Sequence, residues 1–147
     1  ALTYWTYCAR LEAKGFRRLV GAEDIMHALG VAGDVSLIGY LFQDTTVKEK
    51  PEAVAGFARA SRAAKEMLAA DPTTWEVVRP LMAAENDATF EALKRDFLSG
   101  IPRRPVAAER TDAEKLYAVM SRLGGPRLVG KGAGLPPDLY YDAGRNG

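Results

Sequence analysis

The stretch PEAVAGFARASRAAKEML, residues 51–68, indicates the longest helix of this chain. Pro51 suits the first position of a helix, where the missing N–H costs no hydrogen bond. Apolar or small residues then recur at spacings of three and four, the period of one helix face. These residues are Val54, Phe57, Ser61, Ala64 and Leu68. We therefore predict a helix of about five turns that buries this stripe.

The sequence beyond residue 68 is also typical of helices. Asp71 followed by proline ends the long helix and caps the next one, which Pro80 breaks or kinks. Phe90 and Phe97 lie in phase on a further helix. The stretch TDAE, residues 111–114, matches a capping box and predicts that the last long helix begins there. We expect the C-terminal two thirds of the chain to be helical.

The N-terminal third predicts short strands between helices. The segment VSLIGYLF, residues 35–42, is apolar along nearly its whole length, as in a strand buried on both faces. FRRLV, residues 16–20, predicts another strand. Helices over residues 6–14 and 22–29 end at Gly15 and Gly30, which suit the position after a helix. This order is β-α-β-like, so we expect an α/β fold with a parallel sheet.

Composition favours a folded globular chain. Of 147 residues, 48% are hydrophobic and 27% are charged, both near the globular average. The net charge is +1 and the basic residues occur in short pairs, so no nucleic-acid partner is expected. The sequence contains no uninterrupted run of about 18 apolar residues, so we expect no transmembrane helix.

The single cysteine, Cys8, and the single histidine, His27, lie far apart in the sequence. A zinc site built from these two ligands is therefore not expected, and we predict no metal and no cofactor. Cys8 is predicted to be a small buried hydrophobe, and His27 to be structural or on the surface.

The C-terminal stretch, residues 132–147, is rich in glycine and proline and predicts an extended tail. It could wrap the domain through Leu135, Leu139 and Tyr140. The few strands at the front fall short of the four to six of an ordinary sheet. The first residue is Ala1, so we expect this chain to be a processed product or a fragment.

Three stretches resemble the substrate-binding proteins of ABC transporters for taurine, nitrate, sulfonates and thiamine precursors. TYWTYCARLEAKGFRRL, residues 3–19, is similar to a family segment with a Trp-x-x-Tyr-like turn before a helix. GYLFQDTTVKEKPEAVAGFARASRAAKEML, residues 39–68, resembles the crossing between two lobes and the helix after it. GIPRRPVAAERTDAEKLYAVMSRLGG, residues 100–125, resembles the family's C-terminal helices. Thr6 stands where the family often has proline.

The resemblance implies the helix-rich C-terminal half of a two-lobed type 2 periplasmic binding protein, with few short strands followed by several helices. Residues 1–38 would belong to the second lobe and the crossing, residues 39–131 to the first lobe and the C-terminal helices, and residues 132–147 to the tail. The implied function is periplasmic capture of a small organic anion or a heterocyclic or aromatic solute, without turnover. The implied partners are that solute, an N-terminal half of the same protein and an ABC permease in the inner membrane.

The resemblance places the ligand site at the turn before the first helix. Trp5 and Tyr7 would stack on an organic solute, with Tyr4 and the hydroxyl of Thr6 beside them. Arg10 could hold a carboxylate or sulfonate in bidentate fashion. Tyr40 could be a hinge or cleft residue. The alternatives are that the aromatic rings pack against another part of the protein, that Arg10 is a solvated surface residue and that Tyr40 is a core residue.

Two other function classes stay open. The chain could be a small helical protein-interaction domain, whose N-terminal aromatic residues bind a partner. It could also be a pyrimidine-synthase-like enzyme, which would need iron and chemistry around His27. The sequence does not identify the solute within the proposed classes.

Overall fold

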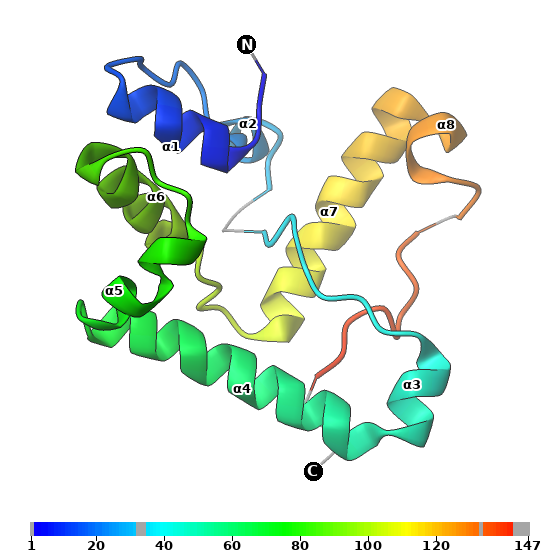
Figure 1. The fold of residues 1–147 in the computed structure, drawn as a ribbon. Coiled ribbons are helices and arrows are strands. Elements are labelled where there is room, and N and C mark those ends of the chain that lie inside the picture. Colours follow the sequence, from blue (N-terminus) through cyan, green and yellow to red (C-terminus); the bar gives the residue numbers. More distant parts are fainter. Residues whose placement is uncertain (1, 32–34, 133, 143–147) are drawn as a thin grey trace. The chain divides into compact units, whose positions relative to one another are not determined.

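The computed structural model describes residues 2–31, 35–132 and 134–142. The described residues form α-helices and one short 3-10 helix, and none of them forms a strand (Figure 1). The elements are α1 (Trp5–Ala13), α2 (Ala22–Ala28), α3 (Asp44–Glu49), α4 (Pro51–Ala70), α5 (Thr74–Val78), η1 (Arg79–Leu81), α6 (Asp87–Ser99), α7 (Val106–Gly124) and α8 (Pro126–Val129).

The predicted α/β fold is therefore wrong. Residues 16–20 and 35–42 are irregular, and Leu41, expected inside a buried strand, is 92% exposed. A strand becomes stable when its N–H and C=O groups pair with a neighbouring strand. Neither segment has such a neighbour among the described residues, so apolar composition alone does not make either segment a strand.

The chain folds as two units, each built from two separate stretches. Unit 1 comprises Ala1–Leu19 and Leu41–Ile101, and unit 2 comprises Val20–Tyr40 and Pro102–Gly147. Unit 1 therefore contains α1, α3, α4, α5, η1 and α6, whereas unit 2 contains α2, α7 and α8.

The core of unit 1 lies where α1 packs against α6 (Figure 1). Ala9 of α1 is fully buried, and it clusters with Ala92 and Leu93 of α6. Small side chains at this contact let the two helix backbones approach closely, and the close-packed contact leaves little room for a larger group.

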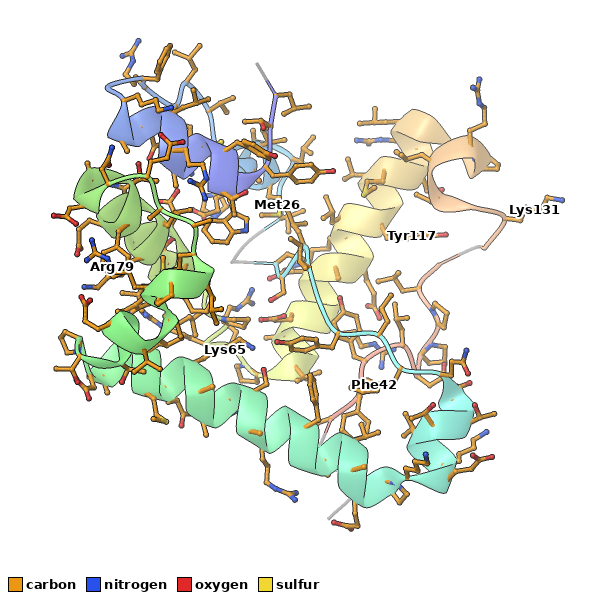
Figure 2. The ribbon with its side chains drawn as sticks, in the orientation of Figure 1. Met26, Phe42, Lys65, Arg79, Tyr117 and Lys131 are labelled. Carbon is orange, nitrogen blue, oxygen red and sulfur yellow. The ribbon has the colours of Figure 1, made fainter. Side chains whose placement is uncertain are left out.

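Aromatic residues extend this core towards α5. Phe90 and Trp75 are both buried, and the Trp75 ring meets Phe97 edge-on with a centroid distance of 5.5 Å. The Trp75 indole N–H donates a hydrogen bond of 2.8 Å to the Leu68 carbonyl, near the end of α4. The Arg79 guanidinium lies 4.3 Å from the Phe90 ring centroid, and Figure 2 labels this arginine. These contacts tie α4, α5, η1 and α6 together.

Several local predictions for unit 1 are confirmed. Pro51 opens α4, and α4 ends at Ala70, directly before Asp71. The Asp71 carboxylate accepts hydrogen bonds from the backbone N–H and the hydroxyl of Thr73, which lowers the pKa of Asp71 and orders the turn into α5. The expected buried stripe on α4 is only partly present, because Val54 is buried and Phe57 is exposed.

The predicted glycine stops are also confirmed. Gly15 and Gly30 have positive φ angles of 88° and 77°. After α1, the N–H of Gly15 donates to Glu12 and the N–H of Phe16 donates to Leu11. This pattern is the Schellman motif, and the equivalent pair of bonds closes α2.

The predicted capping box at residues 111–114 is wrong. The helix α7 already begins at Val106, after Pro105, so Thr111 lies within it and donates its hydroxyl to the Ala107 carbonyl. The residues before Thr111 include alanine, glutamate and arginine, which favour helix and extend it towards Pro105.

The α1–α6 contact makes a prediction about stability. Replacing Ala9 with leucine should destabilise the protein by about 1–3 kcal/mol, because the larger side chain must force the two helices apart. Chemical denaturation of Ala9→Leu against the wild type measures this loss. Ala60→Leu, at an exposed position of α4, is the matched control and should change the free energy of unfolding little. Equal stability of the two variants would contradict the packing described here.

Candidate functional site

The first turn of α1 gathers aromatic and hydroxyl groups on the surface of unit 1. Tyr4, Trp5 and Tyr7 are 75%, 40% and 59% exposed, and Thr6 is half-buried. Tyr4 is the N-cap residue, and Trp5, Thr6 and Tyr7 are the first three residues of the helix. We call these four residues the aromatic tip.

Two backbone N–H groups of the aromatic tip have no hydrogen-bond acceptor among the described residues. The N–H groups of Tyr7 and Cys8 donate to the Tyr4 carbonyl. Those of Trp5 and Thr6 make no hydrogen bond within the part of the chain that the structure describes. No side chain caps the helix, and no acidic residue lies in its first turn. Oriented N–H groups and the helix dipole both favour an anion at such an end.

The rest of α1 holds this tip in place. Arg10, a predicted ligand-binding residue, donates hydrogen bonds of 3.1 Å to the carbonyls of Met82 and Ala83. Ala83 has a positive φ of 48°, so the arginine secures a turn that a residue with a side chain rarely adopts. Arg10 therefore joins α1 to the loop before α6.

Ion pairs reinforce the other end of α1. The Glu12 carboxylate lies 2.6 Å from a guanidinium nitrogen of Arg95 and 3.0 Å from one of Arg18. The Asp96 carboxylate lies 2.7 Å from a guanidinium nitrogen of Arg18. Exposed ion pairs contribute little individually, but two carboxylates shared between two arginines form a network that fixes the geometry better than an isolated pair.

Tyr40 belongs to a different unit from the other predicted site residues. It belongs to unit 2, whereas Tyr4, Trp5, Thr6, Tyr7 and Arg10 all belong to unit 1. The structure brings the aromatic tip together through sequence adjacency on α1, and Tyr40 is an exposed residue of the irregular segment 35–42.

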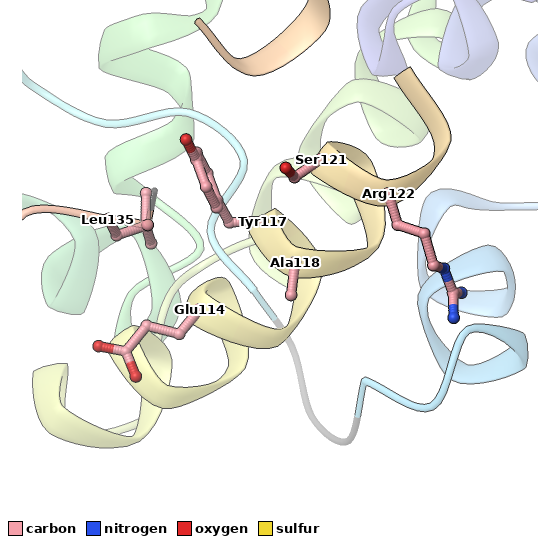
Figure 3. Close-up of a pocket in the computed structure, with 7 residues that line it drawn as sticks. Glu114, Tyr117, Ala118, Ser121, Arg122 and Leu135 are labelled. Atoms are coloured by element: carbon pink, nitrogen blue, oxygen red, sulfur yellow. The ribbon is translucent and has the colours of Figure 1, made fainter. Parts of the chain in front are cut away.

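Unit 2 has a hollow along α7 that sequence reasoning missed (Figure 3). Its volume is about 460 Å³, and it is lined by Glu114, Tyr117, Ala118, Ser121, Arg122, Gly134 and Leu135. The Tyr117 hydroxyl donates to the Gly132 carbonyl at 2.9 Å, which holds the chain after α8 against α7. Figure 3 shows the Arg122 side chain extending away from Tyr117 and Leu135.

Part of this hollow had a sequence signal. Glu114, Ala118 and Ser121 follow the spacing of one helix face. Leu135 is half-buried, as expected for a tail residue that packs on the domain, whereas Leu139 is exposed. The half-buried Tyr140 has its pKa raised, by burial first and by the nearby Glu109 carboxylate second.

A buried carboxylate anchors the start of α7. Asp112 is 3% exposed, and its oxygens lie 2.7 Å from an Arg104 guanidinium nitrogen and 3.0 Å from the Lys115 ammonium nitrogen. The hydrogen bond from Arg104, followed by that from Lys115, lowers the pKa of Asp112 below its ordinary value of 3.8. The charge is therefore paired and satisfied, which is what a buried carboxylate needs.

The described residues form neither a metal-binding cluster nor a membrane-spanning helix. No group of three or more His, Cys, Asp or Glu side chains there could hold a metal ion. No helix there is both long and apolar enough to cross a membrane. His27 is exposed on α2, and the half-buried Cys8 thiol lies 3.9 Å from the Thr3 carbonyl oxygen.

Comparison with known proteins assigns no family: no protein-family model and no curated protein matches this chain.

The Asp112 anchor makes a pH-dependent prediction. A lowered pKa in the folded state means that the Asp112 carboxylate stabilises the fold above pH 3.8 and loses that effect as pH falls through the folded pKa. Asp112→Asn should therefore be less stable than the wild type at pH 7, and the difference should shrink in acid. Urea denaturation at several pH values between about 3 and 7 measures it. Asp138→Asn, at an exposed position, is the control. A difference in the free energy of unfolding between Asp112→Asn and the wild type that stays constant with pH would contradict the pairing of Asp112 with Arg104 and Lys115.

Proposed function

We propose that this chain is a solute-binding component of an ABC importer, which captures a small organic anion or a heterocyclic or aromatic solute in the periplasm. The observation that carries the proposal is the aromatic tip: exposed rings and unused N–H groups at the start of a helix whose body is anchored. The resemblance of residues 3–19, 39–68 and 100–125 to importer binding proteins is the second support. The described residues do not form the α/β sheet that the resemblance implies, so the proposal rests on the aromatic tip and on the sequence resemblance alone.

The chemistry of the aromatic tip suits a flat solute with an acidic group. The Trp5 and Tyr7 rings offer apolar faces for stacking, and their N–H and O–H groups can orient a polar substituent. The spare N–H groups of Trp5 and Thr6 can donate hydrogen bonds to a carboxylate or sulfonate, and no acidic side chain of the first turn opposes the charge of that group.

Rigid placement adds to this argument. Ala9, one turn after the start of α1, is buried against α6. Arg10 donates a hydrogen bond to the Met82 carbonyl, and Glu12 forms an ion pair with Arg95 of α6. A ligand that meets an already ordered helix loses less entropy on ordering the protein than one that meets a free segment. The anchored body of α1 therefore supports recognition by its exposed first turn.

A small helical protein-interaction domain is a second candidate. It is favoured by the absence of strands among the described residues and by large apolar side chains on the surface. On this account the aromatic tip would contact a protein partner instead of a solute.

Ligand titration tests the solute-binding proposal. We expect saturable binding of at least one member of a panel containing taurine, nitrate, benzoate and a pyrimidine, measured by isothermal titration calorimetry. Trp5→Ala should weaken that binding by roughly tenfold or more, because loss of the stacking contact and of the apolar area it buries costs about 1.4 kcal/mol or more. The matched control is Phe16→Ala, which removes an exposed ring just beyond α1 and should leave the affinity unchanged.

The outcomes separate the two candidates. Trp75 is buried, so a change in tryptophan fluorescence that Trp5→Phe abolishes would place the solute at the aromatic tip. Cooperative unfolding with no thermal shift from any panel member would reject the solute-binding account and favour the interaction domain. Binding that Trp5→Ala leaves intact would reject the aromatic tip as the site.

A further inference from the structure

The end of α7 and the short helix α8, both in unit 2, carry charge of one sign. Between residues 115 and 137 the sequence has four basic residues and no aspartate or glutamate, although the whole chain has 20 basic and 19 acidic residues. Three of the four are Arg122, Arg127 and Lys131, which are exposed and form no ion pair with any residue that the structure describes. This part of unit 2 therefore has a local excess of positive charge.

Two large apolar side chains lie among these cations in the sequence. Leu123, near the end of α7, is 71% exposed, and Leu128 of α8 is 57% exposed. Figure 2 shows the Lys131 side chain extending away from the ribbon just after α8. We call Arg122, Leu123, Arg127, Leu128 and Lys131 the basic corner.

Contacts within unit 2 fix the basic corner. A Cβ atom at Gly124 would lie 2.6 Å from the Cβ atom of Leu128, so glycine at this position lets α8 fold back onto the end of α7. The Tyr117 hydroxyl of α7 lies 2.9 Å from the Gly132 carbonyl oxygen and 3.3 Å from that of Val129. The corner is therefore ordered before a partner meets it, which lowers the entropy cost of binding.

The mixture of charged and apolar side chains distinguishes between possible anionic partners. Nucleic acids are held by basic side chains on phosphate and by polar or aromatic side chains on bases, so they leave the two exposed leucines without a role. A stable protein interface buries about 1,000 Å² or more, which is large for a corner of ten residues. An anionic bilayer offers phosphate groups to the cations and an apolar layer beneath them to the leucines.

We propose that the basic corner binds the surface of a bilayer that contains anionic lipids. Leu123 and Leu128 enter the boundary between headgroups and acyl chains, and the three basic side chains lie beside lipid phosphate groups. Because the apolar contribution of two leucines is small, binding needs both contributions and is reversible. The aromatic tip belongs to unit 1, so this inference does not depend on the proposed solute site.

Vesicle sedimentation tests the contribution of charge. We expect the protein to bind phosphatidylcholine vesicles that contain roughly 30% phosphatidylglycerol at least tenfold more tightly than vesicles of phosphatidylcholine alone. Changing all three basic residues of the corner to glutamine should weaken this binding by roughly thirtyfold or more, because each cation near an anionic surface contributes about fivefold. Raising the salt concentration should also weaken it.

A matched control removes the same charge elsewhere. Three exposed arginines of unit 1 are changed to glutamine in one variant: Arg17, Arg59 and Arg62. This variant has the same net charge as the corner variant, so it should keep most of the affinity for anionic vesicles if the basic corner is the site. Thermal unfolding of both variants shows whether each keeps the fold.

A fluorescent probe tests the entry of the leucines. In a Cys8→Ser background, Leu123→Cys is labelled with a dye whose emission moves to the blue in apolar surroundings. Anionic vesicles should cause that shift at position 123. The control is Leu81→Cys, at a position of η1 in unit 1 where the leucine is 85% exposed, and its dye should not shift. Leu123→Ser should weaken vesicle binding by roughly threefold or more, and Leu81→Ser should not.

The outcomes are decisive in both directions. Binding to anionic vesicles that the corner variant weakens and the control variant does not, with a dye shift at position 123 alone, supports the proposal. Absence of vesicle binding overturns it, as do equal effects of the two charge variants and equal dye shifts at positions 123 and 81. A DNA duplex that binds as tightly as the anionic vesicles, with no dye shift on the vesicles, would instead indicate a general polyanion site and also overturns it.

Discussion

The burial of Ala9 against α6 is the contact on which unit 1 depends. It joins the first helix to a helix far along the chain, and the hydrogen bonds of Arg10 and the ion pairs of Glu12 surround it. Close packing of this kind tolerates little change in volume, whereas the surrounding ion pairs are exposed and individually weak. The small side chain of Ala9 therefore sets the position of α1, and the polar contacts hold its orientation.

This arrangement divides α1 into two parts with different roles. Its middle faces the core, and its beginning carries the aromatic tip at the surface. Surface aromatic residues on a mobile segment would have to be ordered by any ligand that they bind. On α1 they are ordered by packing one turn away, so their exposure is compatible with recognition. The same physical logic applies whether the tip meets a solute or a protein.

Local signals in the sequence predicted local structure well. Pro51 at the start of α4 and the glycines after α1 and α2 act through backbone geometry within a few residues, and each appears as expected. The predicted strand at residues 35–42 failed because a strand depends on a distant partner, which apolar composition cannot supply. The capping box predicted at Thr111 does not form, because helix-favouring residues before it extend α7 back to Val106 and leave Thr111 inside the helix.

The candidate site shows the same limit. The aromatic tip was recognisable because its residues are adjacent in the sequence. The role of Arg10 was not, because its acceptors lie 72 and 73 residues away. The pairing of Asp112 with Arg104 and the hollow beside Tyr117 likewise arise from segments that no short-range pattern connects.

The long separation between α1 and its partner has a consequence for synthesis on the ribosome. Glu12 and Arg95, which meet across the α1–α6 contact, are 83 residues apart. At roughly 5–20 residues per second, α1 emerges several seconds or more before α6 has been made. During that interval α1 has no partner for its apolar face, and a nine-residue helix is marginal by itself. The packed position of α1 is therefore reached only once α6 has been made, and its aromatic residues are open to chaperones during that interval.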